Sequence, residues 1–519
     1  MNTLGHRIFI RSLGLCYFLA FASLMVQLRG LISSHGILPA AEFLGLVSHN
    51  ISGTLFSKFL QLPSLFWFNA SDRFLFGACF LGIVLSLNLI VRKDRNKFDI
   101  VEFISLLMLY LLYLSFVNVS RDFLSFQWDI LLLETGFLST VFVLCKTSEF
   151  ATKIITWLFR LLVFKLMFMS GLVKLYTHDE TWANMTALTY HYYTQPLPNP
   201  LSFFVHQLPR WFHLFSCALM FVIELIVPLF IFGGRFLRQA AALLFIGFQL
   251  VIIATGNYCF FNLLTIFLCI WLVDDSMLEK LLPDSIVMKF HRPQEISNTD
   301  QIFSRQIAHQ LIDLNSLNPR NIISTNIIRS LIIILASIII VTDAFFIIIR
   351  SPVNPTIISN IIQMINPLIN PLANFHLNNP YGLFATMTTT RNEIVIQGTN
   401  DLKSNAWLDY EFFFKPQNPK NIPAQVAPYQ PRLDWQMWFA ALSSYREQPW
   451  FVNFCIKLLE GEASVLRLLK HNPYPDHPPK YLRAIIYEYK FNKLEVYARS
   501  GEYWSREYRE EYMPPISLR

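Results

Sequence analysis

Residues 100–119 read IVEFISLLMLYLLYLSFVNV, an apolar run long enough to cross a lipid bilayer as a helix. Similar runs recur along the chain, and the segment 41–68 is amphipathic and rich in Phe, which is typical of a re-entrant or interfacial segment. We therefore expect a multi-span α-helical membrane protein. Its nine expected spans are 8–28, 73–91, 100–119, 130–146, 154–175, 211–232, 239–256, 258–273 and 328–349.

The composition agrees with this class. Of 519 residues, 54% are hydrophobic and 15% are charged, whereas a soluble domain carries about 25% charged residues. The net charge of +7 is spread over loops and a polar tail, so the bilayer is the expected partner and no nucleic acid is needed to explain it. The seven cysteines have neither disulfide nor zinc spacing, and no nucleotide-binding or hydrolase motif occurs. No cofactor or metal is expected.

Basic residues beside short loops predict the orientation. They place the N-terminus on the cytoplasmic side, and the loops 29–72, 116–129 and 176–210 and everything after residue 350 on the other side. That other side is the endoplasmic reticulum lumen in a eukaryote or the periplasm in a bacterium, so the chain is expected in the endoplasmic reticulum membrane or the inner membrane. The basic residues used are His6, Arg7, Arg11, Arg92, Lys93, Arg95, Lys97, Lys146, Lys153, Arg235 and Arg238.

The domain organisation follows from changes in pattern. Residues 1–273 form a membrane domain of about eight spans, 274–327 a cytoplasmic connector, 328–349 the last span and 350–380 a linker or membrane-surface stretch. Residues 381–519 form a mixed, β-containing soluble domain on the non-cytoplasmic side. Alternation predicts strands in 393–401, 406–416 and 481–491, and helical spacing predicts helices in 433–445 and 449–471.

Two lysines fall within the expected span 154–175. Lys165 and Lys174 are nine residues apart, which places them on opposite faces of a helix, so they cannot act as a pair. Lys174 shares its face with the small residues Ser170 and Gly171, which allow close approach of a helix or ligand. A lysine in a membrane is a functional candidate, although one near a span end can also reach the interface.

The stretch FQWDILLLETGF contains two acidic residues. Asp129 and Glu134 are five positions apart and do not form one carboxylate pair. We expect Asp129 to cap the start of its helix and Trp128 to anchor at the membrane interface. Glu134 needs a partner within the membrane, for which Arg160 and Lys165 are the candidates.

Two further spans carry polar residues. Glu224 lies four residues before Pro228, which frees a backbone acceptor and predicts a kink with a local polar pocket. In TGNYCFFNLLTI, the polar residues Asn257, Tyr258 and Asn262 are expected to make hydrogen bonds between helices.

Residues 190–209 read YHYYTQPLPNPLSFFVHQLP, and their prolines enforce extended backbone. His191 and His206 are fifteen residues apart, which is not a metal-binding spacing. The segment is either a rigid recognition surface or a packed interfacial loop. Its candidate residues are His191, Tyr192, Tyr193, Gln195, Pro196, His206 and Gln207.

Four motifs together resemble the lipase maturation factor family: QWDILLLETGFL, TALTYHYYTQPLPNPLSFFVHQLP, TGNYCFFNLLTI and VAPYQPRLDWQMWFAAL. The resemblance extends from GILPA at 36–40 to EYMPP at 511–515. It implies a membrane protein, in animals of the endoplasmic reticulum, that assists folding and assembly of secreted lipases, with its C-terminal domain in the lumen. The residues we expect to contact a client are His191, Tyr193, Gln195, Pro196, Arg432, Asp434 and Trp435.

A second, local resemblance concerns SGLVKLYTHDETW at 170–182. It is similar to a segment of the vitamin K-dependent carboxylase-type membrane domain, in which a lysine serves as a base. That likeness implies a catalytic base at Lys174 acting on a lipophilic, quinone-like substrate. A membrane enzyme is thus the alternative to a folding factor.

Overall fold

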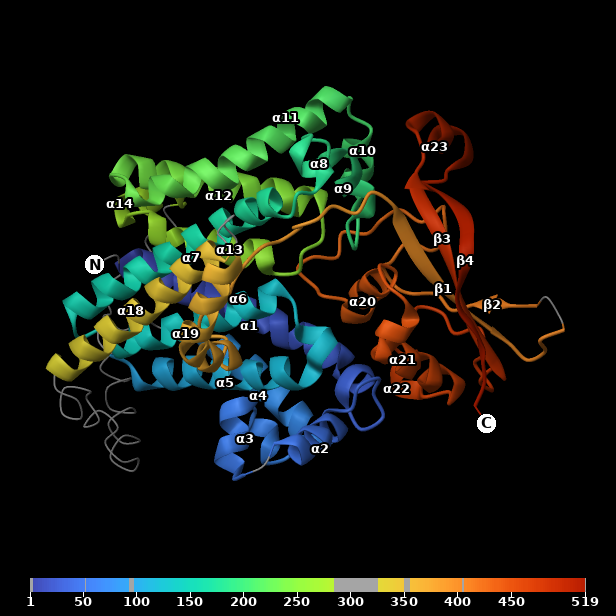
Figure 1. Ribbon diagram of the computed structural model, residues 1–519, viewed down its shortest axis with the longest axis horizontal. Helices are drawn as coiled ribbons and strands as arrows, with labels where there is room; N and C mark the ends of the chain where they lie inside the picture. The colour runs from blue at the N-terminus through green and yellow to red at the C-terminus, as the bar shows by residue number, and fades with distance from the viewer. Residues whose placement is uncertain are drawn as a thin grey trace.

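The computed structural model describes residues 3–51, 53–92, 98–283, 325–349, 355–403 and 406–518. Long helices lie side by side, and a small sheet domain lies at one end of them (Figure 1). The helices of the membrane part are α1 (Thr3–Ile32), α2 (Ala40–Asn50), α3 (Leu55–Gln61), η1 (Leu65–Trp67), α4 (Asp72–Val91), α5 (Ile100–Ser120), η2 (Arg121–Leu124), α6 (Gln127–Leu144), α7 (Glu149–Tyr176), α8 (Glu180–Ala183), α9 (Leu188–Thr194), α10 (Pro200–His206), α11 (Arg210–Phe221), η3 (Val222–Ile226), η4 (Val227–Phe232), α12 (Arg235–Thr255), α13 (Phe261–Leu268), η5 (Cys269–Leu272), α14 (Asp275–Leu281), α18 (Thr325–Ile348) and α19 (Pro355–Asn374).

Seven helices among these described residues are long and apolar enough to cross a membrane, which confirms an integral membrane protein. They match seven of the nine expected spans. The expected span 154–175 lies within the 28-residue α7, which carries Arg160, Lys165 and Lys174 and is not among the seven. The expected span 258–273 is wrong in length, because the helical segment Phe261–Leu272 is shorter than the roughly 20 residues that a crossing needs.

The segment 41–68 forms α2, α3 and η1 at the lower edge of the molecule in Figure 1. Several of its apolar side chains are exposed, including Leu46, Phe56 and Phe68. The interfacial or re-entrant position remains a prediction for this segment.

The start of α1 lies at one end of the helices, together with the loops that the basic residues predict to be cytoplasmic. The backbone N–H of Gly5 donates to Asp275 (3.0 Å), and Arg11 donates to the carbonyl of Arg92 (2.9 Å). Lys146 lies 2.7 Å from Glu102 in the same region. The residues Lys93, Arg95 and Lys97, and most of the predicted connector, lie outside the described residues.

The opposite end carries the C-terminal part of the chain (Figure 1). The loops 29–72, 116–129 and 176–210 all contact residues after 350. Ser464 donates to the carbonyl of His35 (3.3 Å), Gln436 donates to the carbonyl of Asp122, and Arg391 donates to the carbonyl of Tyr193 (2.9 Å). The two groups of loops predicted from charge therefore lie at two ends of the fold.

The C-terminal sheet has the strand order β2-β1-β3-β4 and is antiparallel throughout. Its core strands agree with the predicted ones, and Ile394 pairs with Ile486 in their register. The predicted strand 406–416 is mostly wrong, because only Leu408–Asp409 pairs in the sheet. The strands are β1 (Arg391–Thr399), β2 (Leu408–Asp409), β3 (Tyr481–Phe491) and β4 (Trp504–Ile516).

A layer of short helices separates this sheet from the membrane helices (Figure 1). The predicted helix 449–471 is split, because Gly461 adopts φ +69°, a conformation that ends helices and favours glycine. Ring contacts such as Phe123 with Trp450 (5.9 Å between centroids) continue the core from membrane helices into this layer. The helices of this layer are α20 (Arg432–Ala440), η7 (Tyr445–Glu447), α21 (Pro449–Leu459) and α22 (Ala463–Leu466), and a further helix, α23 (Leu494–Ser500), lies at the end of the sheet.

The segment 350–380 does not behave as a simple linker. Its described part begins with helix α19. Beyond α19 the chain turns into the membrane domain, where Asn378, Asn379 and Tyr381 are buried. The C-terminal part is therefore joined to the membrane domain by buried polar contacts as well as by the covalent chain.

Candidate functional site

Arg432, at the start of α20, extends into the membrane domain and is fully buried. Its Nη2 donates to Oδ1 of Asp129 (3.2 Å) and its Nη1 donates to Oδ2 (3.3 Å). Nη1 also donates to the carbonyl of Phe123 (2.6 Å), and the hydroxyl of Tyr113 donates to Asp129 Oδ1 (2.5 Å). A carboxylate in so dry a site needs such partners, since an unpaired buried charge is very costly. Two distant parts of the chain are thus locked by one ion pair.

The expected role of Asp129 as a helix cap is wrong. Helix α6 has Phe126 at its N-cap with no side-chain cap hydrogen bond, and the Asp129 carboxylate points to Arg432 instead. Trp128 is likewise no lipid-facing anchor, because it is buried between the rings of Phe126 (4.7 Å) and Trp435 (4.9 Å). Both residues belong to the interface between the membrane domain and α20.

Asp434, two residues after Arg432, organises the neighbouring loop. Its Oδ1 accepts hydrogen bonds from the backbone N–H groups of Phe414 (2.8 Å) and Lys415 (3.0 Å). Burial raises the pKa of Asp434 to about 6, although these hydrogen bonds and the Lys415 ammonium oppose the rise.

Segment 190–209 packs against the C-terminal sheet through Arg391 on β1. Arg391 is buried and donates to the carbonyls of Tyr193 (2.9 Å) and Pro196 (2.9 Å) and to that of Gln195. Its charge is balanced by Glu393 (2.6 Å). Tyr193 lies in the last turn of helix α9 and Gln195 leaves that helix in extended backbone, so the three carbonyls can converge on one guanidinium, whose donors form a rigid fork.

Asn257 joins the segment to the C-terminal part from the other side. Its amide oxygen accepts from the N–H groups of Val426 (2.7 Å) and Ala427 (2.9 Å), and its amide nitrogen donates to the carbonyls of Ala424 (2.8 Å) and Leu197 (3.1 Å). All the hydrogen-bonding capacity of this side chain is used between parts of the chain that are far apart in sequence. Asn257 lies between α12 and α13 and in neither helix, so the predicted hydrogen bonds between helices are wrong for this residue.

Of the remaining candidates, Tyr258 and Gln207 make hydrogen bonds, whereas Nδ1 of His191 and Nδ1 of His206 have no partner among the described residues. The hydroxyl of Tyr258 donates to Gln195 Oε1 (2.8 Å) and lies 3.2 Å from His191 Nε2. Gln207 donates to the carbonyl of Asn492 (3.1 Å). Burial lowers the pKa of both His191 and His206 to about 4, so the segment is uncharged at neutral pH.

The segment 190–209 is not extended throughout, because it includes helices α9 and α10, and it packs against the C-terminal part of the chain. Tyr192, Tyr193, Gln195 and Pro196 are buried, and so are Arg432, Asp434 and Trp435. Such side chains offer little surface to a client while the interface stays closed, and their direct contact with a client stays a prediction.

A second buried cluster centres on Lys165 of α7. Its Nζ lies 2.6 Å from Glu134 Oε1 and 3.1 Å from Asp343 Oδ1, and it donates to Asn378. The predicted partnership of Glu134 with Lys165 is confirmed. Arg160, the other candidate, instead donates to the carbonyl of Trp271 (3.0 Å).

The other oxygen of Glu134 is held by residues that the sequence analysis did not select. Oε2 accepts from the hydroxyl of Tyr381 (2.8 Å) and from the side chain (3.0 Å) and backbone (3.1 Å) of Asn379. These residues lie at the end of the predicted linker, where a polar, Asn-rich composition gives no sign of burial. The sequence signal that could have indicated these contacts is that a buried acid such as Glu134 must have hydrogen-bond partners for both of its oxygens.

Lys174 lies on the opposite face of α7 with a partner of its own. Its Nζ lies 2.7 Å from Glu224 Oε2, donates to the carbonyl of Ser170 (2.8 Å) and lies 5.4 Å from the ring centre of Trp182. Lys165 and Lys174 thus belong to separate clusters, as their spacing predicts. Close packing at Gly171 permits this pair, since a Cβ there would lie 2.9 Å from the Cβ of Glu224.

The predicted kink at Glu224 and Pro228 is confirmed. Glu224 lies in η3, a π-helical turn, and Pro228 lies in the 3-10 turn η4 that follows. Asn262 on α13 donates to Gln249 Oε1 on α12 (2.7 Å), which is the expected bond between helices. Around these groups is a cavity of about 640 Å³ between α7, α11 and α12.

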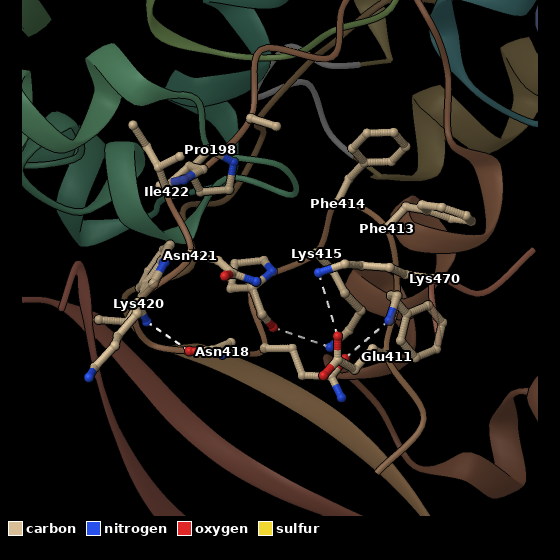
Figure 2. A pocket seen from close by; sticks show the side chains of 16 residues that line it. Pro198, Glu411, Phe413, Phe414, Lys415, Asn418, Lys420, Asn421, Ile422 and Lys470 are labelled. Atoms are coloured by element: carbon tan, nitrogen blue, oxygen red, sulfur yellow. Dashed lines mark hydrogen bonds and ion pairs between the residues drawn. The ribbon is translucent and has the colours of Figure 1, made fainter. Parts of the chain in front are cut away.

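A second cavity, of about 350 Å³, lies in the C-terminal domain beside the segment 190–209. Figure 2 shows Pro198 and Ile422 at one rim and Phe413 and Phe414 at the other. Phe413 and Ile422 are each about half exposed, and Glu411 pairs loosely with Lys470 (3.5 Å). This groove combines accessible apolar and charged side chains. We call it the 411–424 groove.

The fold and these clusters define a class: an integral membrane protein with a β-containing C-terminal domain that is fixed to its helices by a buried ion pair and buried hydrogen bonds. Residues 4–280 match the family profile described as the lipase maturation factor transmembrane domain. Residues 377–514 match the lipase maturation factor C-terminal domain. The chain belongs to the lipase maturation factor family.

Individual relatives are similar over almost the whole chain. Lipase maturation factor 2 of Xenopus laevis is 33% identical, with 100% of this chain and 83% of that protein covered. Lipase maturation factor 1 of Bos taurus is 32% identical, covering 98% and 88%. Lipase maturation factor 1 of Homo sapiens is 32% identical, covering 98% and 87%. No solved structure matches the chain.

Proposed function

We propose that this protein is a membrane-resident maturation factor that assists folding and assembly of secreted lipases or other exported clients. The observation that carries the proposal is the similarity to lipase maturation factors over 98% or more of the chain. The similarity includes both matched domains, so it is not limited to a generic set of membrane helices.

The proposed orientation has the N-terminus in the cytoplasm and the C-terminal domain in the endoplasmic reticulum lumen of a eukaryote or the periplasm of a bacterium. The positive-inside rule supports it. The grouping of Arg11, Arg92 and Lys146 at the end opposite to the C-terminal domain supports it as well.

We place the client contact on the 411–424 groove. The motif residues around Arg391 and Arg432 are occupied in holding the domains together, so a client has to meet a surface that is free. Phe413 and Ile422, which belong to the C-terminal domain, supply accessible apolar surface there. Exposed apolar side chains of this kind are typical of protein-contact sites.

The test is complementation in cells that lack lipase maturation factors. The full chain is expressed there, and the activity of a secreted lipase is divided by its secreted mass. The proposal predicts that this specific activity rises on expression. Fully active lipase from cells without any maturation factor, or no rise with a correctly membrane-inserted chain, contradicts it.

A membrane enzyme that uses Lys174 as a base on a lipophilic substrate is the second candidate. Its support is the place of Lys174 on the wall of the 640 Å³ cavity. The Nζ atom is engaged by Glu224 and Ser170, which favours a structural role for the ammonium. Lys174→Ala and Lys174→Arg are compared in the same assay, and activity retained in both at normal protein levels excludes the base.

A further inference from the structure

The cavity beside Lys174 is open to the surrounding bilayer. Its lining includes Phe215 and Leu219 of α11 and Leu244 and Val251 of α12, and all four side chains are strongly exposed on these two candidate spans. In a membrane, exposed apolar side chains of a span face lipid. The opening between α11 and α12 is therefore lateral, and the molecules that reach it are those dissolved in the bilayer.

The inner end of the cavity is polar but carries no net charge. Lys174 and Glu224 neutralise each other at 2.7 Å. Among the other polar groups of the wall, Asn262 is bound to Gln249 (2.7 Å) and His191 Nε2 lies 3.2 Å from the Tyr258 hydroxyl, while His191 Nδ1 has no hydrogen-bond partner among the described residues. A charged head group would meet no counter-charge there, and burying it would be costly.

The ion pair itself leaves an acceptor at this inner end. The Oε2 atom of Glu224 is bound by Lys174, but no hydrogen bond to Oε1 occurs within the part of the chain that the structure describes. A carboxylate oxygen accepts hydrogen bonds and cannot donate them when ionised. The complementary group on a ligand is a neutral donor such as a hydroxyl.

The backbone around Glu224 is irregular, since Pro228 in the next turn has no N–H to donate to it. Glu224 lies in the π-helical turn η3, and α7 approaches this turn closely at Gly171. Single π-turns inside α-helices occur frequently at functional sites. The turn and the close approach together hold the ion pair at the end of an otherwise apolar space.

We propose that this cavity binds an uncharged lipid that carries a hydroxyl head and enters sideways between α11 and α12. The hydroxyl donates to Glu224 Oε1, and the hydrocarbon occupies the apolar space of about 640 Å³, a volume within the usual range of about 300–1,000 Å³ for ligand pockets. The site needs no reaction at Lys174 and no lipase client.

The experiment uses the full chain in membranes and a diacylglycerol whose acyl chain bears a photoactivatable diazirine. The labelled residues are located by mass spectrometry, and labelling is expected on α11 and α12. Two probes with the same acyl chain are compared with it: the acetylated diacylglycerol, whose hydroxyl is blocked, and phosphatidylserine, whose head is anionic. Both are expected to label the cavity about tenfold less.

Gly247, on the cavity wall in α12, allows the space to be filled. A Cβ at Gly247 meets no atom within 4 Å, so Gly247→Ala and Gly247→Leu insert side chains of increasing size without a clash. Labelling is expected to fall slightly with Ala and about tenfold with Leu. The matched control is Gly77→Leu on α4, where a Cβ also meets no atom within 4 Å and which is not part of the wall.

The proposal is overturned by labelling that ignores Gly247→Leu, by equal loss in Gly77→Leu, or by equal labelling with phosphatidylserine. Elution of each variant from a sizing column shows that it is folded. Lipase maturation is measured separately, so a failed maturation assay leaves this result standing and a failed labelling experiment leaves the proposed function standing.

Discussion

Arg432 of the C-terminal domain and Asp129 of α6 form a two-bond ion pair across 303 positions of sequence, with both side chains buried. The pair makes the membrane domain and the C-terminal domain parts of one folding unit. Arg432→Met is expected to lower the free energy of unfolding by about 3–5 kcal/mol, because it leaves a buried carboxylate without its cation. Thermal unfolding of the purified protein in detergent measures the loss.

The double variant Arg432→Met with Asp129→Leu is the critical comparison. Replacing both charges by apolar groups removes the unpaired charge, so its loss of stability is expected to be smaller than that of Arg432→Met alone. The exposed pair Lys457 and Glu460 is the control, and Lys457→Gln should cost less than about 1 kcal/mol. Strictly additive single effects at Arg432 and Asp129 would contradict the coupling.

Arg391→Lys is expected to loosen the segment 190–209 without unfolding the sheet. A lysine has one ammonium and cannot satisfy three carbonyls that converge on a guanidinium fork. Hydrogen exchange of the amides at 193–200 should rise severalfold. Arg483→Lys on the adjacent strand β3 serves as the control, and an equal rise in both variants would show that Arg391 has no special role.

Asp434 is expected to give the stability a pH dependence of defined sign. Its pKa is about 6 in the folded chain and near its ordinary value of about 4 in the unfolded chain, so the folded state holds the proton more tightly. Its contribution to stability is fully present below pH 4 and is lost as the pH rises through 6. The full change is roughly 3 kcal/mol.

The comparison of wild type with Asp434→Asn isolates this effect, because asparagine can still accept from Phe414 and Lys415. The stability of wild type relative to Asp434→Asn should fall between pH 4 and 6 and then stay constant. His191 and His206 act in the opposite direction, since their lowered pKa values destabilise the fold as the pH falls from 6.5 to 4, but they are present in both proteins. A flat difference across this range rules out the assignment.

The 411–424 groove is expected to be the client surface. Phe413→Ser combined with Ile422→Ser should lower the specific activity of a secreted lipase severalfold at unchanged protein level, because half-exposed apolar anchors carry much of the energy of such contacts. Leu408→Ser is the control, since Leu408 is equally exposed in the same domain but lies outside the groove. The assignment fails if all three substitutions act alike.

Hydropathy and simple electrostatics predicted much of this structure. Seven spans follow from apolar runs, and the partnership of Glu134 with Lys165 follows from the cost of an isolated acid in a membrane. The strands β1 and β3 follow from alternation. These features are local in sequence, or require only one nearby partner of opposite charge.

The missed features are long-range or lack a periodic pattern. Nothing near Asp129 points to Arg432, so a local role as a cap was the natural reading of an acid at a helix start. Strand β4 is exposed along Ser505–Glu511 on both faces, which removes the alternation that identifies strands. Asn378, Asn379 and Tyr381 can be buried because they form hydrogen bonds with Glu134 and Lys165, which lie far away in the sequence.

The pairing of Asp129 with Arg432 also sets an order of events during synthesis. Asp129 is synthesised before Arg432, and the two are separated by 303 positions. At about 5–20 residues per second, the delay between their synthesis is roughly 15–60 s. Throughout that interval the membrane helices hold a carboxylate whose cation has not yet been made. The bundle is therefore complete only in chains that have been translated past Arg432, and a chain that ends before Arg432 would carry an uncompensated acid into the bilayer.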